Sequence, residues 1–538
     1  MPETTADTLQ ADVLVIGGGM AGAWAALGAA RAGAQVVLVE KGYCGTSGVT
    51  ASAGPGHWWV PPQAREQAIA QRLAAGEGLA EARWMERVLD TTWRHLPTIA
   101  PHYAFGVDAK GVVQYRALRG PEYLRALRTL VNAAGVRVLD HHPATELLRH
   151  GDGSIAGACG LHLRGSGIPW EIRAGATVIA AGGCAFLSKL LGADNNTGDG
   201  YLMAAEAGAE LSGMEFTNYY TVAPAWSSMT RSMSYAFARY FDADGRELDI
   251  PFGPGATAAL ARALLDGPVA CTLERMPQDL RELLPTISPN VLIAFTRAGV
   301  DPFRDRFPVT LRGAGTVRGI GGLRVAGEGC ETSVPNLFAA GDAASRERVA
   351  GAISGGGAIN SAWALSSGLW SGQAAAARAR RDGRRADGPA RPAGQAGLHA
   401  GASGWDRTAA VATVQRATLD YDRNIFRSAN GLGESVTALD GVWRAISAGG
   451  CAPAPADPVQ RLRLRETAAL VATARWSVHS AFLRPESRGM HRRVDAPASD
   501  PAWAHRIVTG GLDRIWHRAE PAGTGPAQPI HPLTTATP

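Results

Sequence analysis

The sequence predicts an α/β fold in which a Rossmann-like domain is interrupted by an inserted α+β capping domain and followed by a C-terminal helical domain. Three observations carry this prediction: a glycine-rich strand–turn–helix–strand unit at residues 11–41, a return of strand-and-glycine character at residues 313–375, and helical spacing of apolar residues beyond residue 404. A chain of 538 residues is also long for one hydrophobic core, so two or three domains are expected.

The opening unit is Ala11–Lys41, ADVLVIGGGMAGAWAALGAARAGAQVVLVEK. We expect buried strands at residues 12–16 and 35–39, joined by a helix that carries small residues on one face. The turn into the helix has the pattern G-x-G-x-x-G and the second strand leads to an acid, positions occupied by Gly17, Gly19, Gly22 and Glu40.

Each part of this unit has a physical role in binding a dinucleotide. Gly17 permits the tight turn, Gly19 lets the backbone approach a pyrophosphate, and Gly22 lets helix and strand pack closely. The helix N-terminus offers unpaired N–H groups to the phosphates, and the Glu40 carboxylate can accept hydrogen bonds from the ribose hydroxyls. Because all parts occur in order, the unit favours a dinucleotide site over a glycine-rich turn before an ordinary core helix.

The charge balance argues against several classes of function. Lys and Arg total 53 and Asp and Glu total 48, a mild net charge of +5, and the arginines are scattered except for a group at residues 378–385. This pattern argues against a nucleic-acid-binding protein. The first ten residues lack the pattern of a signal peptide. No run reaches the ~20 apolar residues of a membrane helix, so we expect a cytoplasmic protein without a transmembrane segment.

The six cysteines form no C-x-x-C pair and have no spacing typical of a zinc or iron–sulfur site. Each is expected to be a small buried apolar residue. The sequence therefore predicts no metal and no iron–sulfur cluster in this chain, and a reducing compartment.

Composition divides the chain into six regions. Strands are expected near residues 136–139, 156–162 and 176–180, and an amphipathic stripe at residues 436–446 and an Ala-rich stretch at 463–483 predict helices. The regions are residues 1–212 (α/β domain, first segment), 213–312 (capping domain), 313–375 (α/β domain, second segment), 376–404 (linker), 405–519 (C-terminal helical domain) and 520–538 (disordered tail).

Five further segments are informative because of their order along the chain. They are ATVIAAGG at residues 176–183, NTGDG at 196–200, PNLFAAGD at 335–342, GGGAINSA at 355–362 and RPESRGMHRRVDAP at 484–497. Together with the opening unit, they resemble the FAD-dependent flavoprotein family of fumarate reductase and succinate dehydrogenase. L-aspartate oxidase and the adenylylsulfate reductase alpha subunit are relatives in this family. The resemblance spans almost the whole chain except the linker and the tail.

The resemblance implies that the α/β domain binds FAD. Asp342 would hydrogen-bond the ribityl chain, and Thr197, Gly198 and Asp199 would line the flavin side. The helix that begins near residue 358 would point its positive end at the flavin. The implied cofactor-binding residues are Gly17, Gly19, Gly22, Glu40, Lys41, Thr46, Ser47, Gly48, Gly182, Gly183, Thr197, Gly198, Asp199, Gly341, Asp342 and Ser361.

The chain departs from the family where dicarboxylates bind. In covalent members a histidine bonds to the flavin, whereas Gly48 stands at that position here, so FAD is expected to be bound non-covalently. Three substrate histidines and one carboxylate-binding arginine are also absent from the matching segments 214–220, 317–322 and 350–356. A buried carboxylate needs a charged partner. We therefore expect that the substrate is not succinate, fumarate or aspartate.

Other polar side chains in the same segments are candidates to replace the missing groups. Arg318 and Arg348 are expected to bind an anion, and Tyr219 or Tyr220 to act as an acid or an orienting group. Two further candidates are His57, which follows the flavin-adjacent loop, and Arg231. Each of them has an ordinary structural alternative, such as core packing or a surface ion pair.

The sequence thus predicts an FAD-dependent oxidoreductase that moves hydride between a small organic, anionic substrate and the flavin. Electrons would leave to a separate acceptor, such as a ferredoxin-like iron–sulfur protein, a quinone or oxygen. Two alternatives remain open: a sulfur-oxyanion enzyme similar to adenylylsulfate reductase, and an electron-transfer flavoprotein subunit without its own substrate.

Overall fold

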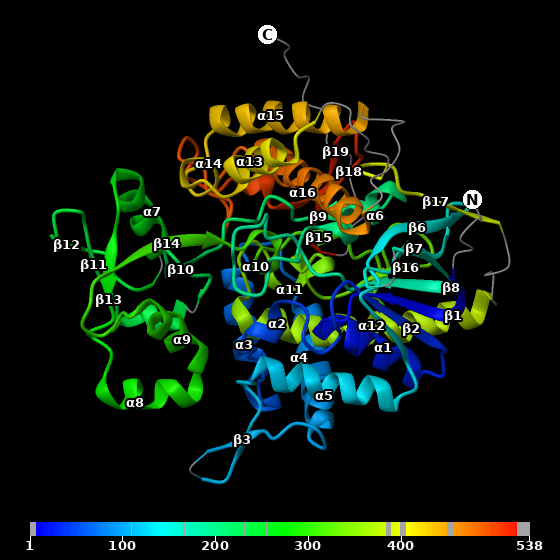
Figure 1. The fold of residues 1–538 in the computed structure, drawn as a ribbon, viewed down its shortest axis with the longest axis horizontal. Helices are drawn as coiled ribbons and strands as arrows, with labels where there is room; N and C mark the ends of the chain where they lie inside the picture. The colour runs from blue at the N-terminus through cyan, green and yellow to red at the C-terminus, as the bar shows by residue number, and fades with distance from the viewer. Residues whose placement is uncertain are drawn as a thin grey trace.

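The computed structural model describes residues 7–108, 110–164, 167–230, 232–253, 255–382, 389–398, 405–448 and 457–523. A central α/β body carries a smaller lobe at one end, and the C-terminal helices lie across the body (Figure 1). The lobe and the body are built from segments that alternate along the chain.

The body is organised on an eight-stranded sheet of order β17-β6-β7-β8-β1-β2-β5, with β16 paired to β8. The strands β16, β8, β1, β2 and β5 are parallel, whereas β17, β6 and β7 pair antiparallel. Their bounds are β1 Asp7–Ile16, β2 Val36–Glu40, β5 Arg137–Asp140, β6 Ala144–His150, β7 Ile155–Leu161, β8 Pro169–Ile179, β16 Leu337–Ala339 and β17 Ala390–Pro392.

Helices cover both faces of this sheet because alternate side chains of β1 enter different cores. Val13 and Val15 pack with α1, α5 and α12 on one face, and Leu14 and Ile16 pack with α6 and α16 on the other. The helices of the body are α1 Met20–Arg31, α2 Val49–Ser52, α3 Arg65–Ala75, α4 Ala82–His95, α5 Gly120–Ala133, α6 Asp199–Glu206, α10 Gly315–Arg318, α11 Glu347–Ala350 and α12 Gly356–Asp382. A short hairpin, β3 Gly106–Val107 and β4 Val113–Gln114, extends from the body.

Two glycines of α12 let this helix approach α1 closely. A Cβ atom added to Gly368 would lie 2.5 Å from the carbonyl oxygen of Ala21, and one added to Gly372 would lie 2.0 Å from that of Ala25. These contacts bring the N-terminal half of α12 beside the glycine-rich turn.

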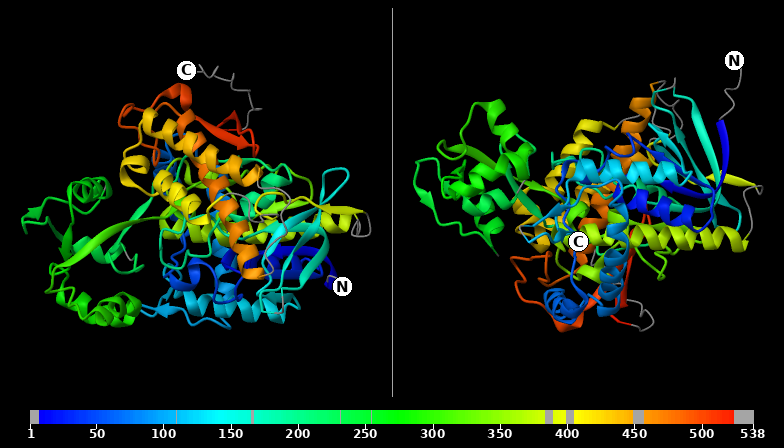
Figure 2. Two further views of the ribbon diagram at one scale, coloured as in Figure 1. Left: turned by 45° about the horizontal axis from the view of Figure 1, so that its top comes forward. Right: turned by 90° about the horizontal axis from the view of Figure 1, so that it is seen from below.

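The smaller lobe is the capping domain, and it projects from the body in both views of Figure 2. Its sheet has the order β10-β14-β13-β11-β12 and its own apolar core. The elements are β10 Tyr220–Pro224, β11 Arg239–Phe241, β12 Glu247–Leu248, α7 Ala256–Asp266, β13 Ala270–Thr272, α8 Gln278–Ile287, α9 Pro289–Ala298 and β14 Phe307–Gly313. Strands β10 and β14 connect it to the body.

The C-terminal region is helical but also contributes a hairpin to a second sheet of the body. The sheet has the order β15-β9-β18-β19. The elements are α13 Arg407–Thr418, α14 Tyr421–Asn424, α15 Ala429–Ala448, α16 Pro458–Leu483, β18 His505–Gly510 and β19 Trp516–Pro521, together with β9 Leu211–Ser212 and β15 Gly322–Leu323. The hairpin ties the C-terminal region to the body.

Two expected boundaries are wrong. Helix α12 continues to Asp382, past the expected start of the linker at 376, and β17 pairs with β6 inside the expected linker. Strand β19 includes Glu520 and Pro521, which the sequence assigned to the tail. Residues 383–388, 399–404 and 524–538 lie outside the described residues.

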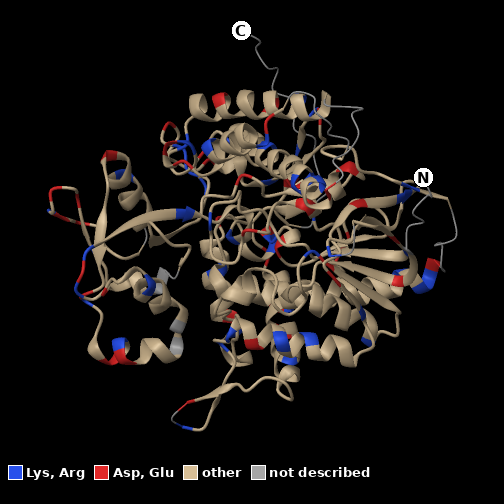
Figure 3. Ribbon diagram, in the orientation of Figure 1, with Lys and Arg blue, Asp and Glu red and all other residues tan. Residues whose placement is uncertain are grey.

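Charges of both signs are interspersed along the described chain (Figure 3). No helix in the described ranges is long and apolar enough to cross a membrane. Within those ranges no group of His, Cys, Asp and Glu side chains has an arrangement that could hold a metal ion.

Candidate active site

The turn between β1 and α1 uses its glycines for two different purposes. Gly17 has a φ of +107°, and a Cβ atom on it would lie 2.4 Å from the carbonyl oxygen of Ala180. A Cβ on Gly22 would lie 1.8 Å from the carbonyl oxygen of Gly17, so both positions are closed by backbone. A Cβ atom added to Gly19 would have no other heavy atom of the protein within 4 Å, apart from those of Gly19 itself and its two neighbours in the chain. That open space beside the N-terminus of α1 fits the close approach of a pyrophosphate.

Glu40 ends β2 with its carboxylate held at the edge of this turn. Its Oε2 accepts a hydrogen bond of 2.6 Å from the Gly18 amide, and its Oε1 accepts one of 2.7 Å from the Gly42 amide. Only 8% of the residue is exposed. A carboxylate fixed in this way retains acceptor capacity toward ribose hydroxyls.

Lys41 has a structural environment that its sequence position did not reveal. Its Nζ donates to Asp199 at 2.7 Å, to Glu466 at 2.8 Å and to Thr197 Oγ1 at 3.2 Å. Burial works against the charged form, but the two carboxylates raise the pKa of Lys41 above its usual value. The ammonium group therefore joins β2 to α6 and α16, and its charge is neutralised within the protein.

One cavity brings most of the expected cofactor residues together. It runs from the glycine-rich turn past the ends of β8 and β16 to the start of α12. Eleven of the sixteen residues line it: Gly17, Gly19, Glu40, Lys41, Ser47, Gly48, Gly182, Asp199, Gly341, Asp342 and Ser361.

The other five expected cofactor residues do not line the cavity. Gly22, Gly183 and Gly198 are packing positions, because an added Cβ would lie within 2.6 Å of a neighbouring oxygen in each case. Thr197 is buried, and its hydroxyl donates to Asp199 at 2.8 Å. Thr46 is exposed on the surface, and its hydroxyl donates to the carbonyl oxygen of Tyr43 at 3.4 Å.

A buried arginine that sequence reasoning missed holds Asp342 in place. The Arg346 side chain is 1% exposed, and its Nη1 donates to Asp342 Oδ1 at 2.5 Å. Its other nitrogens donate to the carbonyl oxygens of Thr316 (2.8 Å), Val317 (2.9 Å) and Gly319 (2.8 Å). Arg346 thus connects the segment after β16 to the α10 segment. No local sequence pattern predicts this role.

Two amides also line the cavity without having been predicted. Asn360 Oδ1 is buried and has no hydrogen-bond partner within the described protein. Asn196 is 6% exposed and lies against Gly182. A buried amide oxygen without a partner is costly unless a ligand satisfies it. This orphaned oxygen, the open space at Gly19 and the held carboxylates fit a bound dinucleotide such as FAD.

Of the expected catalytic residues, Arg318 lines the cavity and Tyr219 reaches it through Arg318. Arg318 Nη1 donates to the Tyr219 hydroxyl at 3.3 Å, and the guanidinium lies 5.4 Å from the centre of the Tyr219 ring. Arg318 ends α10 and is half-buried. The pair brings a cation to the cavity wall.

The structure does not bring two other candidates to the cavity. The Tyr220 hydroxyl donates to the carbonyl oxygen of Leu419 at 2.9 Å, so this side chain is buried between the cap and α14. Arg348 pairs with Glu81 at 3.1 Å. Arg231 lies outside the described residues.

His57 is also not at the cavity. Its ring is 2% exposed, and its Nε2 lies 3.4 Å from the Tyr123 hydroxyl, which itself accepts a hydrogen bond of 2.9 Å from Trp24. Burial lowers the pKa of His57 to about 3. This neutral, enclosed ring cannot exchange a proton with a cavity ligand.

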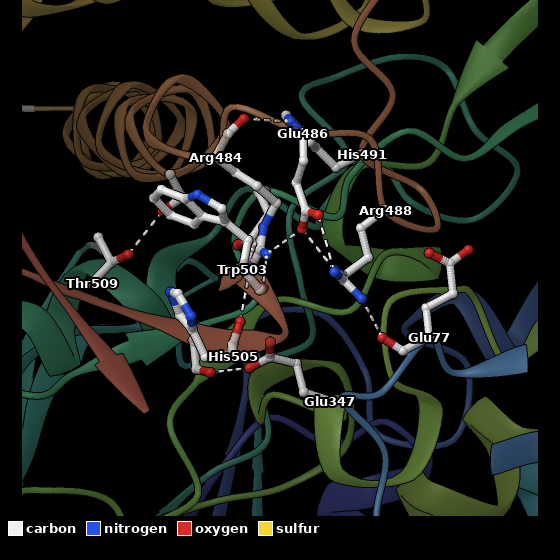
Figure 4. Close-up of polar contacts among 12 residues, drawn as sticks. Glu77, Glu347, Arg484, Glu486, Arg488, His491, Trp503, His505 and Thr509 are labelled. Atoms are coloured by element: carbon white, nitrogen blue, oxygen red, sulfur yellow. Dashed lines mark hydrogen bonds and ion pairs between the residues drawn. The ribbon is translucent and has the colours of Figure 1, made fainter. Parts of the chain in front are cut away.

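The C-terminal segment 484–497 contributes Arg484, Glu486, Arg488 and His491 to a buried cluster of polar contacts (Figure 4). Arg484 is wholly buried and donates to Glu215 Oε1 at 2.8 Å and to Glu486 Oε1 at 2.9 Å. Arg488 donates to the same Glu486 carboxylate at 2.7 Å and 3.0 Å. We call Arg484, Glu486, Arg488, His491 and Glu215 the arginine cluster. Through Glu215 it is joined to the segment that leads into β10, and none of its residues lines the cavity.

Comparison with known proteins agrees with this geometry. A family model for an FAD binding domain matches residues 12–235, and one for the C-terminal part of the fumarate reductase flavoprotein matches residues 415–517. L-aspartate oxidase of Streptomyces coelicolor is 28% identical over 62% of this chain and 63% of its own length. L-aspartate oxidase of Mycobacterium tuberculosis is 26% identical over 94% of this chain and 96% of its own. A solved mutant of E. coli quinol fumarate reductase FrdA shares the fold, with a TM-score of 0.77, 21% identity and coverage of 97% and 98%.

The dinucleotide cavity, which Thr230 of the cap also lines, and the matching FAD binding domain define an FAD-dependent oxidoreductase. The two family matches occur in the order that the sequence motifs predicted, and together they span more than half of the chain. The chain belongs to the FAD-dependent flavoprotein family of fumarate reductase and succinate dehydrogenase.

Proposed function

We propose that this flavoprotein transfers hydride between a small organic anion and FAD that is bound non-covalently. The observation that carries the proposal is Arg318, a cation on the cavity wall that has no carboxylate within 4 Å among the described residues. Gly48, at the position of the covalent histidine in some family members, lines the cavity and has no side-chain atom that could bond to the flavin.

When bound, FAD supplies the hydride-accepting and hydride-donating chemistry. The described residues would bind and orient the ligands: Glu40 would hold the ribose, Asp342 the ribityl chain, and Arg318 the anionic group of the substrate. Tyr219 acts through Arg318 as a positioning residue.

The electron acceptor is a separate molecule in this proposal, because the six cysteines lack the spacing of an iron–sulfur cluster. A ferredoxin-like iron–sulfur protein is the acceptor that we propose to test first. A cytoplasmic location stays a prediction.

The test is an anaerobic titration of the purified holoprotein, followed by its flavin spectrum. We expect that acid precipitation releases FAD into the supernatant and that neither succinate nor aspartate bleaches the flavin band. Bleaching by either dicarboxylate would contradict the proposal. Sulfite and AMP belong in the same titration, because a sulfur-oxyanion enzyme would also use an anion-binding arginine. If no small molecule bleaches the flavin, the electron-transfer alternative is favoured.

A further inference from the structure

The part of the cavity wall beside α10 is largely apolar. Leu190 and Val317 are each 3% exposed and belong to one hydrophobic cluster, against which Val49 and Tyr219 pack. The segment that carries Leu190 lies against α2, because a Cβ on Gly192 would be 3.4 Å from the Cα of Val49. Leu190, Leu191, Val49 and Val317 all line the cavity.

The other polar side chains of the cavity wall near Leu190 and Leu191 are uncharged; besides the amides of Asn195 and Asn196 they are hydroxyls. Thr50, Ser52 and Thr230 line the cavity, and Thr230 is 6% exposed. The Thr230 hydroxyl oxygen already accepts a hydrogen bond from the Leu191 amide at 3.4 Å. These groups can donate single hydrogen bonds to a ligand, but they cannot neutralise a charge.

The charged residues of the cavity differ in what they already bind. Lys41 and Asp199 neutralise each other, Glu40 accepts from two amides, and Asp342 accepts from Arg346. Arg318 has a tyrosine hydroxyl as its partner and no carboxylate in the described part of the chain. The described wall therefore offers one cation to a ligand.

We infer that the substrate carries one anionic group and an apolar body; this inference rests on the proposed function of the same site. The anion pairs with Arg318, and the body lies against Leu190 and Val317. A second carboxylate on the body would be buried against these side chains without a charged partner among the described residues of the wall. The described part of the wall thus selects against dicarboxylates.

Isothermal titration calorimetry on the oxidised holoprotein tests the inference without requiring turnover. The probes are acetate, butyrate, hexanoate and octanoate, the dicarboxylates succinate and adipate, and the uncharged hexanamide. We expect affinity to rise about threefold to fourfold per methylene from acetate to hexanoate. We expect succinate and adipate to bind at least about 100-fold more weakly than butyrate and hexanoate. Equal or tighter binding of the dicarboxylates, or a flat chain-length series, would overturn the inference.

Variants separate the two parts of the site. Arg318→Gln is expected to weaken hexanoate about 10-fold to 100-fold and to leave hexanamide unchanged, because only the acid uses the charge. Leu190→Ser is expected to flatten the chain-length series. Arg304→Gln removes a cation that is 85% exposed in the cap, and hexanoate affinity should not change. Unchanged hexanoate binding in Arg318→Gln would sink the inference.

The calorimetry and the flavin titration fail independently. If hexanoate binds in an Arg318-dependent way but no monoanionic donor ever bleaches the flavin, the ligand class stands and hydride transfer is wrong. If a donor bleaches the flavin but the monocarboxylate series does not bind, hydride transfer stands and the ligand class is wrong.

Discussion

The arginine cluster and the α10 wall of the cavity use the same side chain in opposite ways. Arg484 is wholly buried, and each of its guanidinium nitrogens donates to a carboxylate or a carbonyl oxygen. Arg318 is half-buried and has a tyrosine hydroxyl as its hydrogen-bond partner. Full pairing makes a buried charge part of the scaffold, whereas a cation left without a carboxylate at a cavity is available to a ligand.

Removing the central cation of the arginine cluster should give the largest effect. Arg484→Met would leave Glu215 and Glu486 partly unpaired in a buried region, so we expect a loss of about 3–5 kcal/mol in the free energy of unfolding. Thermal unfolding monitored by circular dichroism measures it, taking the first transition of this multidomain chain.

The control is Arg416→Gln, which breaks an exposed ion pair with Asp420 and Asp422. Its expected cost is below about 1 kcal/mol. If both variants unfold at the same temperature, the arginine cluster does not stabilise the fold as the comparison requires.

Glu347 is a buried carboxyl near the arginine cluster that lacks an ion-pair partner among the described residues. Burial and the nearby Glu215 raise the pKa of the Glu347 carboxyl from 4.5 to about 7, and its Oε1 has no hydrogen-bond partner among the described residues. The folded state therefore keeps a proton that the unfolded chain loses as the pH rises. Stability should fall by about 3 kcal/mol between about pH 4.5 and pH 7 and then level off.

The unfolding temperature measured across this pH interval checks the sign of that slope. In Glu347→Gln the side chain stays uncharged, and this contribution to the slope should disappear. A slope that is unchanged in the variant would assign the pH dependence to other groups.

Arg346 links scaffold and site, and its removal should mainly weaken cofactor binding. Arg346→Met frees Asp342 and leaves the carbonyl oxygens of residues 316, 317 and 319 without this donor. We expect the dissociation constant of FAD to rise about 10-fold to 100-fold, because the carboxylate that we assign to the ribityl chain is no longer held in place.

Quenching of flavin fluorescence measures this constant directly. Arg346→Lys keeps a charge beside Asp342 but cannot reproduce the guanidinium geometry, so a partial recovery is expected. If Arg346→Met bound FAD as tightly as the unchanged protein does, Asp342 would need no support from Arg346.

The opening unit could be predicted because its signals are local. The strand expected at residues 12–16 lies within β1, and the strand expected at residues 35–39 differs from β2 by one residue at each end. The glycine spacing marks the turn between β1 and α1. The end of α12 was missed for a physical reason. Its buried face there consists of alanines such as Ala375, Ala376 and Ala379, so an Ala/Arg stretch resembled a low-complexity linker.

The direction of a side chain could not be predicted when a distant segment decides it. Tyr219 and Tyr220 are adjacent in sequence, yet Tyr219 contacts Arg318 while Tyr220 is buried against α14. Arg348 follows two residues after Arg346, yet it pairs with Glu81 at the end of another loop. The residue types suggested polar partners, but the partners of Tyr220 and Arg348 lie 199 and 267 residues away in the sequence.

The smallest expected effect on stability is that of replacing Arg318, the arginine at the cavity. Arg318→Gln should change the unfolding temperature of the ligand-free protein very little, within about 0.5 kcal/mol, because the lost contact is one long hydrogen bond to a tyrosine hydroxyl. A stability loss as large as that of Arg484→Met would mean that Arg318 is also scaffold. Near-neutral stability together with a large loss of anion affinity would separate the two kinds of arginine, since a residue kept for a ligand contributes its free energy only when the ligand is present.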